Sequence, residues 1–79
     1  QFPLQMLKID RSFVTALDED DGSSGTAIVS AILAMAASLD LQVVAEGIET
    51  ESQRRRLIHM GCRYGQGFLF ARPQRLNLL

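Results

Sequence analysis

The sequence is short of the residues from which disulfides, metal clusters and membrane spans are built. Cys62 is the single cysteine among 79 residues, so the chain cannot form an internal disulfide, and a reducing cytoplasm is its simplest location. His59 is the only histidine, and no other histidine or cysteine has ligand spacing with it, which argues against zinc. No apolar run approaches the ~20 residues of a membrane span, and we expect no signal peptide at the N-terminus.

Net charge is also nearly absent. The chain has 8 Lys and Arg against 9 Asp and Glu, a balance that predicts no attraction to DNA, RNA or a membrane surface. A chain of 79 residues allows one small domain, which buries only about 60% of its unfolded surface. The first residue is Gln1 rather than methionine, which suggests a fragment or a processed product.

What the sequence does contain is an alternation of strand and helix patterns. Apolar or alternating stretches predict strands over residues 3–10, 41–46 and 63–70, with Arg72 and Pro73 ending the third. Apolar residues at helical spacing predict a helix over residues 26–39, preceded by an acidic, solvated loop over residues 18–25. The order strand, helix, strand, helix, strand is typical of right-handed parallel α/β units.

The second predicted helix has clear signals at both ends. Thr50 and Gln53 have capping-box spacing, and Gly61 is a plausible stop. Arginines at positions 54, 55 and 56 follow Glu51, and the first two can pair with it along the helix. The triplet could bind phosphate, but a solvated helix face is the better interpretation.

Polar side chains come at or near the ends of all three predicted strands. Lys8, the only lysine, is on the first strand, Glu46 closes the second, and Gln66 lies on the third between Gly65 and Gly67. Parallel α/β proteins bind ligands at the carboxyl ends of their strands. An ammonium, a carboxylate and an amide there suit phosphate-ester hydrolysis. The alternative is a structural lysine–glutamate ion pair, with glycines that serve only as turns.

Three stretches together resemble the C-terminal part of the EAL domain, a bacterial cyclic di-GMP phosphodiesterase family. They are LKIDRSFV (7–14), AIVSAILAMAASLDLQVVAEGIET (27–50) and GCRYGQGFLFARP (61–73), with VVAEGIET and QGFLF the most specific parts. The resemblance implies an α/β fold, a modified TIM barrel, of which this chain supplies the last three strand–helix units (β-α-β-α-β). Residues 1–79 would then be the C-terminal fragment of a single EAL domain, and the barrel would be incomplete.

The resemblance also implies an activity and its residues. The family hydrolyses cyclic di-GMP to linear pGpG with Mg²⁺ or Mn²⁺. By this likeness Lys8 is the catalytic lysine beside the attacking water, Glu46 is a general base or a partner of the metal-bound water, and Gln66 contacts substrate. Asp10 and Glu49 match acidic family positions that support the metal site or its loop. Phe68 stands where the family often has tyrosine.

The chain departs from the family by what it omits. It has no Glu-Ala-Leu motif, and it lacks the upstream asparagine, glutamate and paired aspartates that ligate the family's metals. We therefore expect the fragment alone to be inactive, and to self-associate or bind the rest of its barrel. The alternatives are a degenerate EAL domain that binds cyclic di-GMP or a protein partner, and an unrelated α/β fragment.

Overall fold

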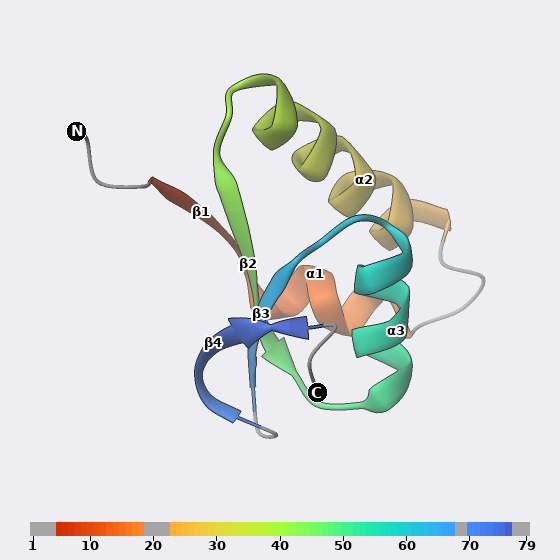
Figure 1. Cartoon of the computed structure of the whole chain (residues 1–79). Coiled ribbons are helices and arrows are strands. Elements are labelled where there is room, and N and C mark those ends of the chain that lie inside the picture. The colour runs from red at the N-terminus through yellow and green to blue at the C-terminus, as the bar shows by residue number, and fades with distance from the viewer. Residues whose placement is uncertain (1–4, 19–22, 68–69, 77–79) are drawn as a thin grey trace.

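The computed structural model describes residues 5–18, 23–67 and 70–76. One four-stranded sheet has the order β1-β2-β3-β4, and the first three strands are parallel, as predicted. Strand β4 is antiparallel to β3. The elements in chain order are β1 Met6–Ile9, α1 Arg11–Ala16, α2 Ser23–Ser38, β2 Gln42–Ile48, α3 Glu51–His59, β3 Tyr64–Gly67 and β4 Phe70–Arg75 (Figure 1).

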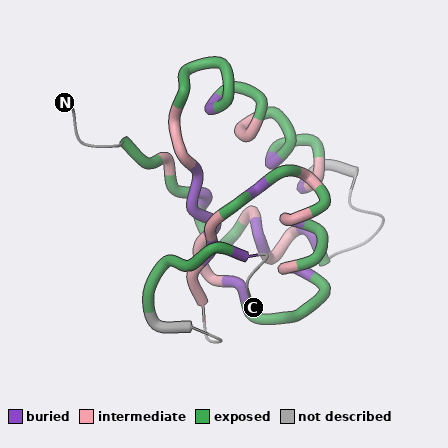
Figure 2. The backbone as a smooth tube through the Cα atoms, viewed as in Figure 1, coloured by how far each residue is buried: buried purple, intermediate pink, exposed green. Residues whose placement is uncertain are grey.

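Helices cover only one face of the described sheet. The three helices lie on one side of the parallel strands (Figure 1), and the buried residues gather where strands and helices meet (Figure 2). That core contains Ile9 of β1, Ala45 of β2 and Leu57 of α3, each at most 1% exposed. Because side chains alternate along a strand, Lys8 and Glu46 belong to the opposite, helix-free face. This face would line the interior of a barrel.

Helix α1 was not predicted. It is only six residues long and has one buried side chain, Val14, so its apolar period is too short to detect. The sequence did contain a start signal for this helix, the N-cap residue Asp10. The Asp10 carboxylate accepts hydrogen bonds from the Ser12 backbone nitrogen at 3.0 Å and from the Ser12 hydroxyl at 2.7 Å. These two bonds lower the pKa of the Asp10 carboxyl, the side-chain bond more strongly than the backbone bond.

The prediction of one strand over residues 63–70 was wrong in its extent. Strand β3 ends at Gly67, and β4 returns antiparallel beside it and includes Arg72 and Pro73, which were expected to end the strand. Proline is tolerated in β4 because an edge strand need not offer every backbone N–H to a neighbour. Phe68, which stands at the family's tyrosine position, lies outside the described residues.

Helix α2 was predicted correctly in type but not in its start. It begins at Ser23 rather than Thr26, and the rest of the predicted acidic loop, beyond Asp18, lies outside the described residues. Val29 and Ala36 are buried, whereas Ile28 is 41% and Leu39 is 61% exposed. The helix contains no charged residue, so much of its outer surface is apolar.

Helix α3 confirms its predicted ends. The Thr50 hydroxyl accepts from the Gln53 backbone nitrogen at 3.0 Å, and the Gln53 side chain accepts from the Thr50 nitrogen at 3.2 Å. Arg54 and Arg55 both pair with Glu51, as predicted. Arg54 does not lie on a solvated face, however: its side chain is 14% exposed and donates to the Leu76 carbonyl at 2.7 Å. It ties the chain beyond β4 to α3.

Helices α2 and α3 end with the same backbone geometry, but a different residue type occupies the position of positive φ. The Leu41 nitrogen donates to the Ala36 carbonyl at 2.8 Å, and the Cys62 nitrogen donates to the Leu57 carbonyl at 2.8 Å. This is the Schellman pattern, which places a residue with positive φ just before the donor. Gly61 fills that place after α3 with φ 99°, but Asp40 fills it after α2 with φ 60°.

We expect Asp40→Gly to stabilise the chain by about 1 kcal/mol. Glycine adopts positive φ without steric cost, and the substitution removes a carboxylate from the negative end of the α2 dipole. The midpoint of urea unfolding at fixed protein concentration measures the gain. Gly61→Ala, the reverse change at the matching position, should lower the midpoint; a lower midpoint for Asp40→Gly would contradict the prediction.

Candidate functional site

Lys8 and Glu46 meet on the helix-free face near the carboxyl ends of β1 and β2. The Lys8 Nζ lies 3.6 Å from Glu46 Oε2, with the two side chains 67% and 35% exposed. An ion pair this open to water contributes at most about 1 kcal/mol to stability. Both groups are therefore accessible to a ligand in this chain, and a structural ion pair inside the closed barrel remains the alternative prediction.

A bulge in β2 explains how an apolar strand can end in a carboxylate. Strict alternation would put Glu46 and Ile48 on the same face. The register instead pairs Glu46 with Gln66 and Ile48 with Gly67, so Gly47 is an extra residue in β2, with φ 75°. Glu46 consequently stays on the helix-free face, while Ile48 is fully buried in the core.

The bulge also requires Gly67. A Cβ on Gly67 would meet the Ile48 carbonyl oxygen, and would lie 2.6 Å from the Ile48 nitrogen and 2.7 Å from its carbonyl carbon. The backbones of β2 and β3 thus approach where only glycine fits. The sequence analysis left open whether the glycines served only as turns, and at Gly67 the structure shows a close approach of the Ile48 backbone instead.

The other three predicted site residues lie in β3 (Gln66), just after β1 (Asp10) and just after β2 (Glu49). Gln66 is the register partner of Glu46 and is half-buried, so it shares the edge of Lys8 and Glu46. Asp10 caps α1, which places its carboxylate in the loop after β1. Glu49 is exposed, and its backbone nitrogen donates to Gln53 Oε1 at 2.7 Å. The roles of these three residues, and of Lys8 and Glu46, remain predictions.

The described residues do not make a metal centre by themselves. Carboxylate oxygen suits Mg²⁺ or Mn²⁺, and Glu46 could supply one ligand or partner. Within residues 5–18, 23–67 and 70–76, no group of three or more His, Cys, Asp or Glu could hold an ion. Burial raises the pKa of the Cys62 thiol, which keeps it protonated and unsuited to bind a metal.

Two further contacts at this end of the sheet were not foreseen. The Thr50 hydroxyl donates to Asp18 Oδ2 at 3.2 Å, linking the end of α1 to the start of α3. Arg11, the first residue of α1, lies against Gly47 of the bulge. The spacing of Asp10 and Ser12 could have revealed the cap that fixes Arg11, but the contact itself joins residues 36 positions apart.

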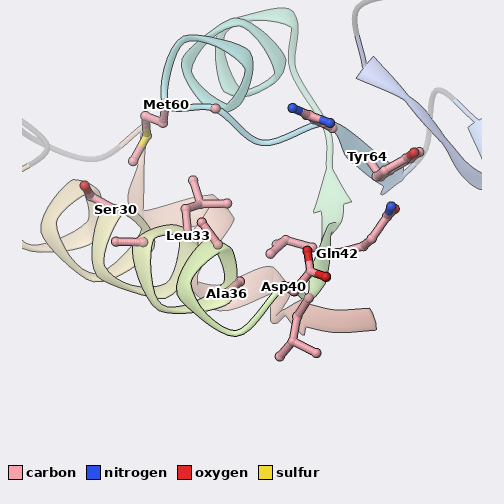
Figure 3. Close-up of a pocket in the computed structure, with 13 residues that line it drawn as sticks. Ser30, Leu33, Ala36, Asp40, Gln42, Met60 and Tyr64 are labelled. Atoms are coloured by element: carbon pink, nitrogen blue, oxygen red, sulfur yellow. The ribbon is translucent and has the colours of Figure 1, made fainter. Parts of the chain in front are cut away.

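A pocket of about 610 Å³ opens at the opposite end of the sheet (Figure 3). It lies between α2 and the turn after α3, and its lining includes Leu33, Asp40, Gln42, Met60 and Tyr64. None of Lys8, Glu46 and Gln66 lines it. Since parallel α/β enzymes use the carboxyl ends of their strands, this pocket is not the candidate active site.

Comparison with known proteins decides the family. The EAL domain family model matches residues 1–73. The chain belongs to the EAL domain family. The cyclic di-GMP phosphodiesterase RocR of Pseudomonas aeruginosa is 42% identical over 73 residues, which are 92% of this chain and 18% of RocR. The sheet and helices are thus a partial EAL fold, which is TIM-barrel-like, as the resemblance implied.

Solved EAL structures with ligands superpose on the chain. The Pseudomonas aeruginosa MucR phosphodiesterase in complex with c-di-GMP is 48% identical, with a TM-score of 0.78 over 99% of this chain and 31% of that one. Klebsiella pneumoniae BlrP1 in a manganese and cyclic di-GMP complex is 33% identical, with a TM-score of 0.77 over 95% of this chain and 19% of that one. No described helix is long and apolar enough to cross a membrane.

Proposed function

We propose that the chain is the C-terminal fragment, residues 1–79, of one cytoplasmic EAL domain that hydrolyses c-di-GMP to pGpG. The observation that carries the proposal is the 3.6 Å pair of Lys8 and Glu46, exposed at the carboxyl edge beside Gln66. Two named relatives, RocR and MucR, are c-di-GMP phosphodiesterases, which makes a cyclic dinucleotide the substrate to test.

Each side chain has a defined task in this proposal. Lys8 neutralises a phosphate oxygen as the attacking water approaches phosphorus. Glu46 accepts a proton from that water, the new P–O bond forms, and the ester P–O bond breaks as its oxygen leaves and takes a proton from solvent water. The Gln66 amide orients substrate or water as donor and acceptor. Mg²⁺ or Mn²⁺, held mostly by residues upstream of this chain, supplies charge stabilisation when bound, and Asp10 and Glu49 support that site or its loop.

A chimera tests the proposal in a complete domain. Residues 1–73 replace the matching segment of RocR, and pGpG formation is measured with and without Lys8→Ala. We expect the chimera to be active and Lys8→Ala to lower kcat by about 10²–10⁴-fold, with little loss of c-di-GMP binding. Arg63→Ala, which removes a cation at the opposite pocket, is the matched control. Near-normal turnover of Lys8→Ala would remove Lys8 from the mechanism.

The alternative function is a degenerate EAL domain that binds c-di-GMP or a protein without hydrolysis. The described residues leave it open because they hold no complete set of metal ligands. Calorimetry on the same chimera distinguishes the two functions. Binding of c-di-GMP without pGpG formation, in a chimera whose RocR parent is active under the same conditions, would favour the alternative.

The isolated 79-residue chain should be inactive and should not be a free monomer. No described strand pairs with the outer edges of β1 and β4, and open edges recruit further strands. Met6, Met35 and Leu39 add exposed apolar surface at 45%, 49% and 61%. Light scattering at micromolar concentration, with a pGpG assay in Mg²⁺ or Mn²⁺, checks both parts. A compact, cooperatively melting monomer, or pGpG formed in proportion to chain concentration, would contradict this prediction.

A further inference from the structure

The bulge that aims Glu46 is enclosed from two sides. On one side Gly67 lets the Ile48 backbone approach. On the other side lies Arg11: a Cβ placed on Gly47 would be 2.5 Å from Arg11 Cγ and 2.7 Å from Arg11 Cβ. The first two carbons of the Arg11 side chain therefore press against the Gly47 backbone, directly after Glu46.

Arg11 is itself fixed by its place in the fold. It is the first residue of α1, where the Asp10 cap holds the first turn through Ser12. Helix α1 packs against β2, and its Val14 side chain is fully buried in the core. In the part of the chain that the structure describes, no carboxylate lies within ion-pair distance of the Arg11 guanidinium. The contact with Gly47 is thus made by the hydrocarbon stem, whose position α1 determines.

We infer that Arg11 is a positioning residue for Glu46. Its stem holds the bulge at Gly47, and the bulge keeps the Glu46 carboxylate on the helix-free face beside Lys8. The inference rests on the proposed function for its kinetic consequence, because a misplaced catalytic group loses rate. It differs from a role in substrate binding, which would require the guanidinium rather than the stem.

Three substitutions in the RocR chimera separate the stem from the charge. Arg11→Met and Arg11→Gln keep Cβ and Cγ but remove the guanidinium, whereas Arg11→Ala also removes Cγ. All four residues form helices readily, so α1 should persist, and melting temperatures check this. We expect Arg11→Met and Arg11→Gln to keep kcat within about twofold of the parent value. Arg11→Ala should lower kcat about tenfold and keep KM within about twofold of the parent value.

Arg11→Ala made together with Glu46→Gln tests whether Arg11 acts through Glu46. Arg11→Ala should then cause no further loss of kcat, because the group that it positions has already been removed. Equal losses in both backgrounds would show a general structural role and overturn the inference. If Arg11→Met and Arg11→Gln lost as much kcat as Arg11→Ala, that result would also overturn the inference, in favour of a contact between the guanidinium and substrate.

A structure of the Arg11→Ala chimera gives a readout that does not depend on activity. We expect the Lys8 Nζ to Glu46 Oε2 separation to grow beyond the present 3.6 Å, with altered backbone at Gly47. An unchanged separation and an unchanged bulge would overturn the inference even if the chimera proved inactive. Inactivity of the unsubstituted chimera would count against the proposed function alone.

Discussion

Glu46→Gln in the RocR chimera should reduce c-di-GMP hydrolysis by about 10²–10⁴-fold while leaving the fold intact. The amide keeps the shape of the side chain but cannot accept the water proton at neutral pH. The fold should survive because the introduced amide keeps the size of the carboxylate and its oxygen can still accept a hydrogen bond from the Lys8 Nζ, which lies 3.6 Å from Glu46 Oε2 in this chain. Initial rates of pGpG formation across the pH range, with a melting curve for each protein, measure the two effects separately.

Glu51→Gln is the matched control for this change. Among the described residues, Glu51 pairs only with arginines of its own helix, at 2.9 Å to Arg54 and 3.3 Å to Arg55, and it lies outside the candidate site. It should leave turnover unchanged. If Glu46→Gln hydrolysed c-di-GMP at the parental rate at every pH, Glu46 would be neither a base nor a partner of the metal site.

Gly67→Ala should destabilise the domain by about 3 kcal/mol or more, a large part of the 5–15 kcal/mol that stabilises a typical domain. The added methyl would collide with Ile48 backbone atoms on the neighbouring strand, and these cannot rotate away as a flexible side chain could. Relief requires β2 and β3 to separate at the bulge. Urea unfolding of the chimera, or the soluble yield where no native state remains, measures the loss.

Gly61→Ala separates this clash from backbone strain. Apart from the two flanking residues, no described residue comes within 4 Å of a Cβ added to Gly61, but its φ of 99° disfavours any side chain. The expected cost there is about 1–2 kcal/mol, from conformation alone. A Gly67→Ala loss no larger than that of Gly61→Ala would mean that the two strands can part easily, and that the bulge does not depend on Gly67.

Local signals in the sequence were enough for most elements and for placing three of the predicted site residues at one edge of the sheet. The capping box at Thr50 and Gln53 joins residues three positions apart, so the start of α3 could be predicted from spacing. Lys8, Glu46 and Gln66 were assigned to one edge because parallel strands share a direction. The structure places Lys8 and Glu46 together and pairs Glu46 with Gln66 in register.

Tertiary structure alone decided that Glu46 and Ile48 lie on opposite faces of the sheet, and that β4 pairs antiparallel with β3 at its edge. Period-two alternation assigns Glu46 and Ile48 to one face, and only the pairing of β2 with β3 inserts the bulge that separates them. Likewise, Arg54 resembled a surface cation until the returning chain brought the Leu76 carbonyl to it. The sequence by itself determined the alternation of the three parallel strands with α2 and α3, and the residue types at their edge, because propensities and caps act over a few residues. The bulge, the β3–β4 hairpin and the Arg11–Gly47 contact depend on residues distant in the chain, whose approach is decided by packing.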